Sequence, residues 1–329
     1  MNEINFKLIP MADVSRLCND FIDLKCATGL KYDTGAKTLR QFVRYCKQNI
    51  HTDYLPEDAI YNWITDTKNQ SIKTKNNLNG VLTGWAKYVF SLGYIPLRLP
   101  SIRYSRNTAF VPHIFTDEEL EKIWNCVDNI RPSHQFPNMH RCIPVLFRLL
   151  YGCGLRIGEA LQIRLQDIDF DKNVITLYHT KLDRERLVPM SDSLAKVIKK
   201  YIESNGEITN GDMLIFFYRK GEALSTHTIY GRFRLTLEKS GIPYEGKLRG
   251  PRLHDFRHTF AVRTMNRLFD KGNDLYVTLP IISAYLGHAN LDTTEKYIRL
   301  TEDRLSTISN SMQLHIPEVF PEVKSDAEF

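Results

Sequence analysis

Apolar residues in the first hundred positions recur at spacings of three and four, the period of an amphipathic helix. Four such runs are LCNDFIDLKCATG, KTLRQFVRYCKQ, PEDAIYNWITDT and a longer run that ends VLTGWAKYVFSLG. Groups rich in Gly, Asn or Asp separate them, and Pro56 lies near the start of the third. The pattern predicts a small domain of four helices over residues 11–93, large enough to hold a modest core of its own.

The helical period stops in residues 94–115, which hold three prolines and three arginines. We expect a basic interdomain linker over residues 101–115, after a helical domain at 1–100. A second domain begins at Thr116, because TDEE has the form of a capping box in which Thr116 caps the helix and Glu119 reaches back. We place this domain at residues 116–310 and a C-terminal tail at 311–329.

The pattern in the second domain alternates between helical and strand-like segments. VITLYHT and RERLVPM resemble two strands, separated by KLD, and predict a hairpin. Helices are expected to about Asp128, around CIPVLFRLLYG, from near Arg156, and over 191–204, 225–240, 254–270, 278–286 and 291–308. The expected fold class is therefore mainly α with a small antiparallel β-sheet, in a helical domain followed by a mixed α/β domain.

Composition narrows the class of protein. No apolar run approaches the ~20 residues of a membrane span, and the N-terminus shows no secretory signal, so we expect a cytoplasmic protein. The six cysteines form no C-x-x-C pair, which argues against a zinc site. Residues 1–110 hold 15 Lys and Arg against 9 Asp and Glu, whereas residues 301–329 hold 2 against 6. A basic N-terminal third fits a polyanionic partner, although a solvated helical surface explains it too.

Two short stretches carry cations in places where chemistry could use them. In YGCGLRIGEAL, Arg156 lies where a helix begins, and Glu159 lies one turn later on the same face, where it can orient the guanidinium. A surface ion pair is the competing interpretation. In HTKLDRERLVPM, Lys181 lies at the tip of the predicted hairpin, where a lysine is usually only solvated.

A third stretch, LHDFRHTFAVRTM, places His254 and Arg257 three residues apart and therefore on one helical face. His258 follows His254 by one turn, and His-x-x-x-His on a helix can bind zinc. The zinc-protease motif has Glu after the first His as its general base, whereas this chain has Asp255. A packed His258 is the favoured interpretation over a metal ligand.

The fourth stretch is LGHANLDTTEKYIRL, in which Tyr297 follows His288 by nine residues. Packing of half-buried aromatic and apolar residues on a helix would explain this stretch alone. The four stretches together, however, form one ordered set of Arg, Lys, His-x-x-Arg, His and Tyr. In this set the chain resembles the tyrosine recombinases of the phage-integrase family, strongly over residues 116–308. The helical region 11–93 resembles that family's core-binding domain by position and character.

The resemblance implies a role for each matching residue. Tyr297 would be the nucleophile, Arg156 and Arg257 would clamp the scissile phosphate, and Lys181 would protonate the leaving 5′-oxygen. His254 and His288 would hydrogen-bond the phosphate or assist proton transfer, and Glu159 would brace the first arginine. The sequence departs from the family pattern in one place. The stretch between Arg257 and His288, which contains KGNDLYVTLP, looks several residues longer than in compact members of the family.

The chemistry agrees with these residue types. Two guanidiniums present planar donor forks to the non-bridging oxygens and stay charged at any working pH. Attack by a tyrosine would conserve the energy of the phosphodiester in a 3′-phosphotyrosine, so rejoining needs no ATP. The sequence has no phosphate-binding loop of the form G-x-x-x-x-G-K-[ST] and no evident acidic cluster for two metal ions. We therefore expect activity without cofactor or metal.

The resemblance also implies partners. We expect double-stranded DNA as substrate, a tetramer on two DNA sites, and a C-terminal tail exchanged between protomers, with an accessory DNA-bending or directionality factor as a further partner. Association with the nucleoid would follow. The expected function is site-specific recombination by the integrase of a mobile element. The alternatives are a type IB topoisomerase, a DNA-binding regulator that no longer cuts, and, more remotely, a zinc hydrolase.

Overall fold

The computed structural model describes residues 6–66, 70–102, 111–178, 185–219, 222–244, 246 and 250–287, without the side chains of residues 275 and 276. The chain divides into two compact units, Met1–Ala109 and Phe110–Phe329. The division falls inside the stretch that was expected to be a linker. Of that stretch, residues 103–110 lie outside the described part of the chain.

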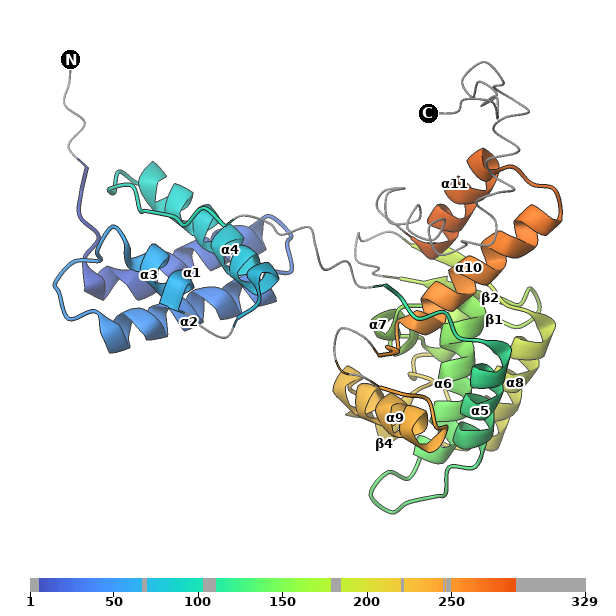
Figure 1. Ribbon diagram of the computed structural model, residues 1–329. Coiled ribbons are helices and arrows are strands. Elements are labelled where there is room, and N and C mark those ends of the chain that lie inside the picture. Colours follow the sequence, from blue (N-terminus) through green and yellow to red (C-terminus); the bar gives the residue numbers. More distant parts are fainter. Residues whose placement is uncertain are drawn as a thin grey trace, which may run out of the picture. The chain divides into compact units, whose positions relative to one another are not determined.

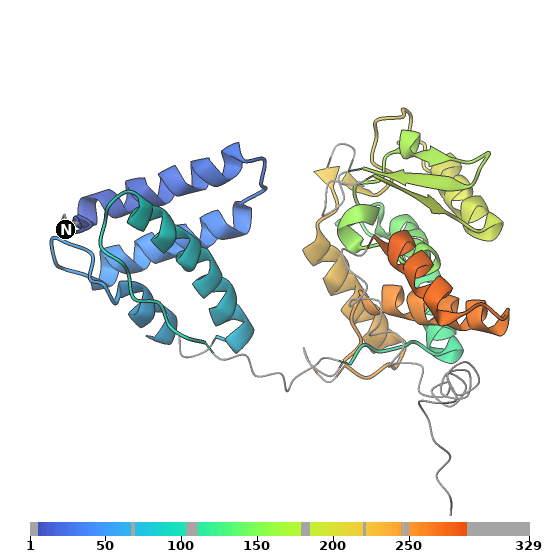
Figure 2. The ribbon, with the colours of Figure 1, turned by 90° about the horizontal axis from the view of Figure 1, so that it is seen from above.

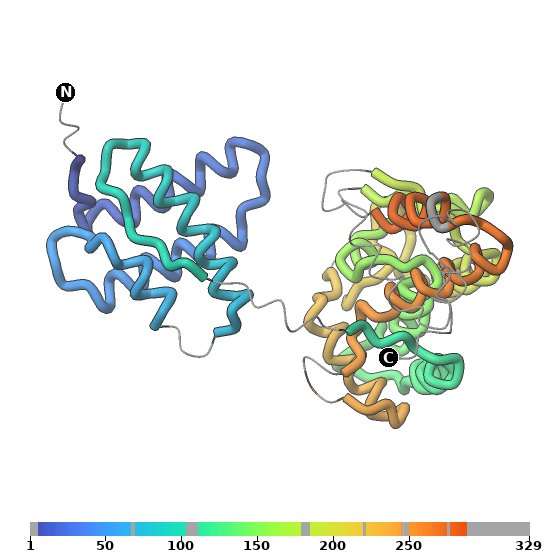
Figure 3. The backbone as a smooth tube through the Cα atoms, turned by 45° about the horizontal axis from the view of Figure 1, so that its top comes forward, coloured from blue at the N-terminus to red at the C-terminus, as the bar shows by residue number. Residues whose placement is uncertain are grey.

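The described part of the first unit contains the four helices that the pattern predicted. They are α1 (Met11–Ala27), α2 (Asp33–Asn49), α3 (Ala59–Asp66) and α4 (Ile72–Ser91), and Figure 3 traces α1 and α2 as neighbours. Apolar positions at helical spacing meet in one core, in which Phe42 packs against Trp63 and Trp85 with ring centroids 5.4 and 5.6 Å apart. Within the described residues, no helix combines the length and the apolar character needed to cross a membrane.

The second unit is built around the apolar helix α6 (Met139–Cys153), which buries nine residues. α5 (Asp117–Asp128), α7 (Ile157–Ala160), α8 (Asp192–Ser204) and α10 (Asp255–Asp270) all pack on α6, and α11 (Leu275–Leu286) packs on α10 (Figure 1). The capping box at Thr116 and Glu119 is present as predicted. The main-chain N–H of Phe115 donates to Oγ1 of Thr259 at 3.0 Å, which fixes the entry of the chain against α10.

A three-stranded antiparallel sheet lies beside α8 (Figure 2), with the order β1 (Ile168–Asp169), β2 (Val174–Leu177) and β3 (Arg186–Pro189). The hairpin predicted from VITLYHT and RERLVPM is β2 and β3, with Val174 opposite Pro189 and Leu177 opposite Arg186. The short 3₁₀ helix η1 (Leu165–Asp167) leads into β1, and a second pair, β4 (Phe217–Arg219) and β5 (Glu222–Ala223), precedes α9 (Thr226–Lys239). The mainly helical fold class with a small antiparallel sheet is thus confirmed.

Three details differ from the sequence pattern. α11 begins at Leu275, three residues earlier than expected, because the carbonyl of Asp274 accepts from the N–H groups of Val277 and Thr278 and starts the helix before Pro280. The strands β1, β4 and β5 were not predicted, since two or three residues are too few to show a period of two. The helix expected over 291–308 and the tail 311–329 lie outside the described residues.

Candidate active site

A tight turn at the end of α6 places Arg156 at the start of α7. Gly154, which follows the last residue of α6, has φ of +59°, a left-handed conformation that strains any residue with a Cβ. A Cβ at Gly154 would lie 2.5 Å from Cδ1 of Phe260 and 3.1 Å from Cδ2 of Leu286. Glycine is therefore required both by the backbone and by the close approach of α10 and α11 to this turn.

Glu159 holds Arg156 in position through two hydrogen bonds. Its carboxylate accepts the main-chain N–H of Arg156 at 2.9 Å and Nη1 of the same arginine at 2.7 Å. This is the contact that the i, i+3 spacing predicted. The Arg156 side chain keeps 28% of its surface exposed, so a ligand can reach the guanidinium from solvent.

A second arginine that the sequence analysis missed binds the same carboxylate. Arg186, the first residue of β3, donates from Nη1 and Nη2 to the two oxygens of Glu159 at 3.0 and 2.9 Å. Burial alone would raise the pKa of Glu159, but the hydrogen bonds and charge of Arg186, followed by the hydrogen bonds from Arg156, outweigh it and lower the pKa to about 2. Glu159 is therefore an anion at any working pH.

A signal for Arg186 was present in the sequence. Side chains alternate between the two faces of a strand, so Arg186 shares a face with Val188, which is fully buried, whereas Leu187 between them is 65% exposed. A charge on the inward face of a strand needs a partner of opposite sign. Glu159 is that partner, and only the tertiary fold brings the two together.

Arg257 lies in the first turn of α10 and is 1% exposed. Its Nη1 donates to the carbonyl of Gly154 at 2.7 Å, and its Nη2 donates to the carbonyl of Leu286 at 2.6 Å. One guanidinium therefore joins the turn after α6 to the C-terminal end of α11. His254, three residues earlier, directly precedes α10.

The three arginines converge on the turn that ends α11. Arg257 binds the carbonyl of Leu286, and Nη2 of Arg156 donates to the carbonyl of Gly287 at 3.1 Å. Gly287 has φ of +64°, and a Cβ there would lie 2.8 Å from Nη1 of Arg186. The end of α11 is thus held by Arg257 of α10 and by Arg156, which directly precedes α7, and Arg186 of β3 lies close to it. His288 follows this turn directly in the sequence.

His254 lies beside these cations and is electrically neutral at pH 7. The residue is exposed, but nearby protein atoms weaken the hydration of its ring. This desolvation lowers the pKa of His254, and the charges of Arg257 and Arg156 lower it further. Glu159 opposes the shift, and the resulting pKa is about 4. A neutral imidazole can donate one hydrogen bond and accept another. His254 is therefore suited to hydrogen-bond a phosphate oxygen or to take up a proton.

His258 and Asp255 give no support to a zinc site. The rings of His254 and His258 lie edge to face with centroids 4.8 Å apart, and Nε2 of His258 lies 4.0 Å from Oδ1 of Asp255. Asp255 is fully buried, and this burial raises its pKa to about 6 despite a hydrogen bond from the main-chain N–H of Arg252 at 2.7 Å. In the part of the chain that the structure describes, no three His, Cys, Asp or Glu residues are grouped to hold a metal ion.

Lys181, His288 and Tyr297 lie outside the described residues. Of the predicted set, the structure therefore places Arg156, Glu159, His254 and Arg257 and brings them together. Lys181 belongs to the connection between β2 and β3, and β3 begins with Arg186.

The four charged side chains favour an anionic ligand. Arg156, Arg186 and Arg257 against Glu159 leave two formal positive charges at one turn of the backbone. Guanidiniums in a partly buried site bind phosphate oxygens through charge-assisted hydrogen bonds and stabilise additional negative charge. The arrangement suits a reaction at a phosphodiester.

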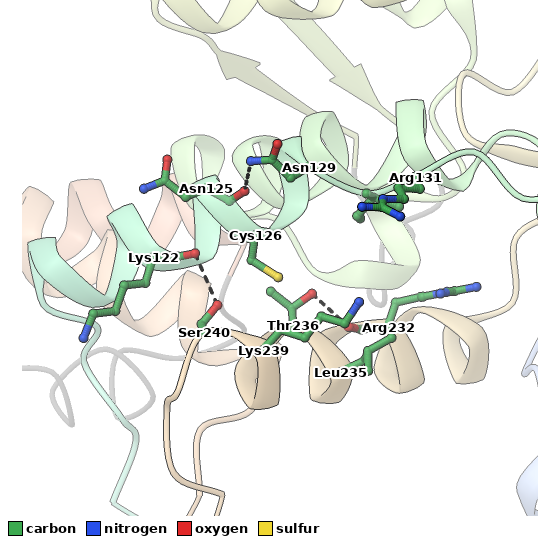
Figure 4. Close-up of a pocket in the computed structure, with 11 residues that line it drawn as sticks. Lys122, Asn125, Cys126, Asn129, Arg131, Arg232, Leu235, Thr236, Lys239 and Ser240 are labelled. Atoms are coloured by element: carbon green, nitrogen blue, oxygen red, sulfur yellow. Dashed lines mark hydrogen bonds between the residues drawn. The ribbon is translucent and has the colours of Figure 1, made fainter.

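A separate hollow of about 810 Å³ lies between α5 and α9 (Figure 4). Lys122 and Arg232 are among its lining residues, and Oγ of Ser240 donates to the carbonyl of Lys122 at 3.2 Å. Among the predicted site residues that the structure describes, none of Arg156, Glu159, His254 and Arg257 lines it. The hollow is therefore separate from the cluster of Arg156, Glu159, His254 and Arg257.

Known proteins resemble this chain over most of its length. Residues 113–304 match the Phage integrase family. A putative integrase/recombinase, y4rB, of Sinorhizobium fredii is 25% identical over 304 residues, which cover 88% of this chain and 93% of the relative. The tyrosine recombinase XerA of Pyrococcus horikoshii is 24% identical over 300 residues, which cover 90% of this chain and 94% of XerA.

Solved structures share the fold. The XerH site-specific recombinase bound to a palindromic difH substrate, in a post-cleavage complex, superposes with a TM-score of 0.63 at 22% identity, over 91% of this chain and 84% of XerH. A lambda integrase dimer bound to a COC′ core site superposes with a TM-score of 0.62 at 16% identity, over 90% of this chain and 78% of the lambda integrase chain. Because the family match covers more than half of its residues, this chain belongs to the phage integrase family.

Proposed function

We propose that this chain is a site-specific DNA recombinase, the integrase of a mobile element, that cuts and rejoins DNA through a 3′-phosphotyrosine on Tyr297. The observation that carries the proposal is the convergence of Arg156 and Arg257 on the Leu286–Gly287 turn. These two arginines occupy the positions of the family's motif. His288 follows that turn directly, and Tyr297 lies nine residues further along the chain.

The proposed roles follow from charge and exposure. Arg156, which stays partly exposed, binds a non-bridging oxygen of the scissile phosphate, and the buried Arg257 supplies charge beneath it. The surrounding cations favour the phenolate of Tyr297, which at a usual pKa of about 10 is scarce at neutral pH. Neutral His254 accepts or donates a hydrogen bond at the phosphate, with His288 as its counterpart.

Lys181 is the proposed general acid. The 5′-oxygen that leaves the phosphorus is a poor leaving group unless it is protonated, and a positioned acid contributes about 10²–10⁴-fold to the rate. The Tyr297 oxygen forms the new bond to phosphorus as the bond to the 5′-oxygen breaks. A 5′-hydroxyl of a second strand reverses this step, so neither ATP nor a metal ion enters the balance.

Named relatives support a DNA partner. XerH was solved bound to difH, the lambda integrase bound to a core site, and the Tn1549 transposon integrase in complex with transposon right end DNA. Phosphate contacts should dominate the affinity of this chain for duplex DNA and make it salt-sensitive. We extend the proposal to a tetramer on two DNA sites in the cytoplasm, with exchange of the tail 311–329 between protomers and an accessory DNA-bending or directionality factor.

The test is formation of a covalent protein–DNA adduct. The full-length protein is incubated, with EDTA present, with nicked, end-labelled duplexes from the flanks of its own gene, and the products are resolved by denaturing electrophoresis. We expect a site-dependent adduct that is lost in Tyr297→Phe. An adduct without site preference would instead indicate a topoisomerase, and specific binding without any adduct would indicate a regulator that does not cut.

A further inference from the structure

One carboxylate is shared by two guanidiniums in the site. Glu159 accepts from Nη1 of Arg156 at 2.7 Å and from both terminal nitrogens of Arg186 at 3.0 and 2.9 Å. The side chains of Glu159 and Arg186 are only 10% and 12% exposed. The interaction is therefore poorly screened by solvent, and its charges act strongly on their neighbours.

Because Arg186 shares the carboxylate, Glu159 can orient Arg156 without cancelling the positive charge that a phosphate would meet. Glu159 orients Arg156, but a carboxylate in contact with a guanidinium also cancels most of the positive field that a phosphate would meet. Arg186 balances the carboxylate with a second positive charge. With Arg186 in place, the set of Arg156, Arg257, Arg186 and Glu159 carries two positive charges, and without it the set carries one.

We propose that Arg186 is a positioning residue for strand cleavage, which neutralises Glu159 so that Arg156 is held in place and still acts as a full cation toward the scissile phosphate. This inference rests on the proposed function. Arg186 binds Glu159 rather than the DNA, and it acts on the reaction through Arg156. The Arg186 guanidinium also lies close to the turn that precedes His288, since a Cβ added at Gly287 would be 2.8 Å from its Nη1.

A purely structural ion pair is the competing explanation. In that case Arg186 would only hold β3 against α7, and any variant that breaks the pair would lose activity through disorder of the site. The two explanations differ when both charges are removed together. The balance of charge is then restored, whereas the ion pair between β3 and α7 stays broken.

The experiment compares four full-length variants: Arg186→Gln, Arg186→Lys, Glu159→Gln and the double variant Arg186→Gln/Glu159→Gln. Single-turnover rates of adduct formation at saturating protein are measured beside the dissociation constant for the same DNA. We expect Arg186→Gln to slow cleavage by about 10²-fold, with a much smaller change in affinity, because Glu159 would then offset the charge of Arg156, an effect comparable with losing one donor to a developing anion. Arg186→Lys, which keeps the charge but not the fork, should lie between this variant and wild type.

The double variant distinguishes the charge-balancing role of Arg186 from a purely structural ion pair. We expect it to cleave at least about tenfold faster than Arg186→Gln, a coupling that a double-mutant cycle detects directly. A double variant as slow as Arg186→Gln would overturn the proposal in favour of a structural pair, and so would wild-type rates in Arg186→Gln.

Two controls keep the result interpretable. If Arg186→Gln does not fold, as judged by circular dichroism, Glu159→Gln is compared with the double variant. Loss of Arg186 should then slow cleavage much less than about 10²-fold because no carboxylate remains to be neutralised, and a double variant about 10²-fold slower than Glu159→Gln would overturn the proposal. Absence of an adduct from the wild-type protein would contradict the proposed function itself, whereas equal cleavage by wild type and all variants would contradict only the role of Arg186.

Discussion

Gly154 affects both the stability of the second unit and the position of Arg257 in the site, so Gly154→Ala is an informative substitution. The left-handed φ of +59° costs an alanine about 1–2 kcal/mol. The new Cβ would also lie 2.5 Å from the ring of Phe260, and overpacking of this kind costs about 1–3 kcal/mol. The expected loss of unfolding free energy is therefore about 2–5 kcal/mol.

The same substitution should impair cleavage. Relief of a 2.5 Å contact to an ordinary separation of 3.4 Å requires a shift of nearly 1 Å. The carbonyl of Gly154 accepts from Arg257 at 2.7 Å, so the shift moves a residue of the site. A displacement of about 1 Å can reduce a rate about 10²-fold.

The assay is urea unfolding followed by circular dichroism, with adduct formation measured in parallel. For an m-value of about 3 kcal/mol/M, the loss lowers the midpoint by about 1 M. Gly158→Ala is the matched control, since Gly158 lies in α7, has no positive φ and would have no heavy atom within 4 Å of an added Cβ. It should stabilise the protein by about 0.5–1 kcal/mol. If Gly154→Ala unfolded at the wild-type midpoint, the argument from φ and packing would be refuted.

Three further predictions follow from the site. Gly287→Ala should slow adduct formation more than it weakens DNA binding, because its Cβ would lie 2.8 Å from Nη1 of Arg186; unchanged single-turnover rates would contradict this. Asp255 has a folded-state pKa raised from 3.8 to about 6, so its protonation favours the folded state at low pH, and its contribution to stability is lost as pH rises from about 4 to 6. Urea titrations across that range should show this loss in wild type and not in Asp255→Asn; equal pH dependence would refute the burial argument. EDTA should leave the rate of adduct formation unchanged, whereas loss of activity that Mg²⁺ or Zn²⁺ restores would contradict a metal-independent reaction.

Local patterns were enough to predict several elements of the fold and one contact of the site. The period of three and four residues located the helices of the first unit, and the capping box located the start of α5. The spacing of Arg156 and Glu159 predicted their contact, because both partners lie within one turn. Such features depend on neighbours in the sequence and need no knowledge of the fold.

The missed features depend on tertiary contacts. Arg186 binds Glu159, which lies 27 residues away in the sequence, and Arg257 binds the carbonyl of Leu286, which lies 29 residues away. No local period encodes the hydrogen bonds that Arg257 of α10 and Arg156, which directly precedes α7, donate to main-chain carbonyls at the end of α11. The requirement for glycine at position 154 likewise comes partly from Phe260, which lies in a different helix.

The described tyrosine nearest in sequence to the proposed nucleophile is a poor competitor for it. Tyr285 is partly buried, its hydroxyl donates to the carbonyl of Pro189 at 3.4 Å, and burial raises its pKa above the usual value. Its phenolate is therefore disfavoured, whereas the proposed account requires a reactive phenolate at Tyr297. The two residues can be separated chemically, because Glu295 lies between them.

The most direct test of the central claim is to identify the amino acid that carries the DNA. The adduct is digested with nuclease and with a protease that cuts after glutamate, and the peptide that retains a nucleotide is sequenced by mass spectrometry. We predict peptide 296–302, KYIRLTE, with the nucleotide on Tyr297. A nucleotide on Tyr285, or on any residue other than Tyr297, would contradict the assignment of the nucleophile.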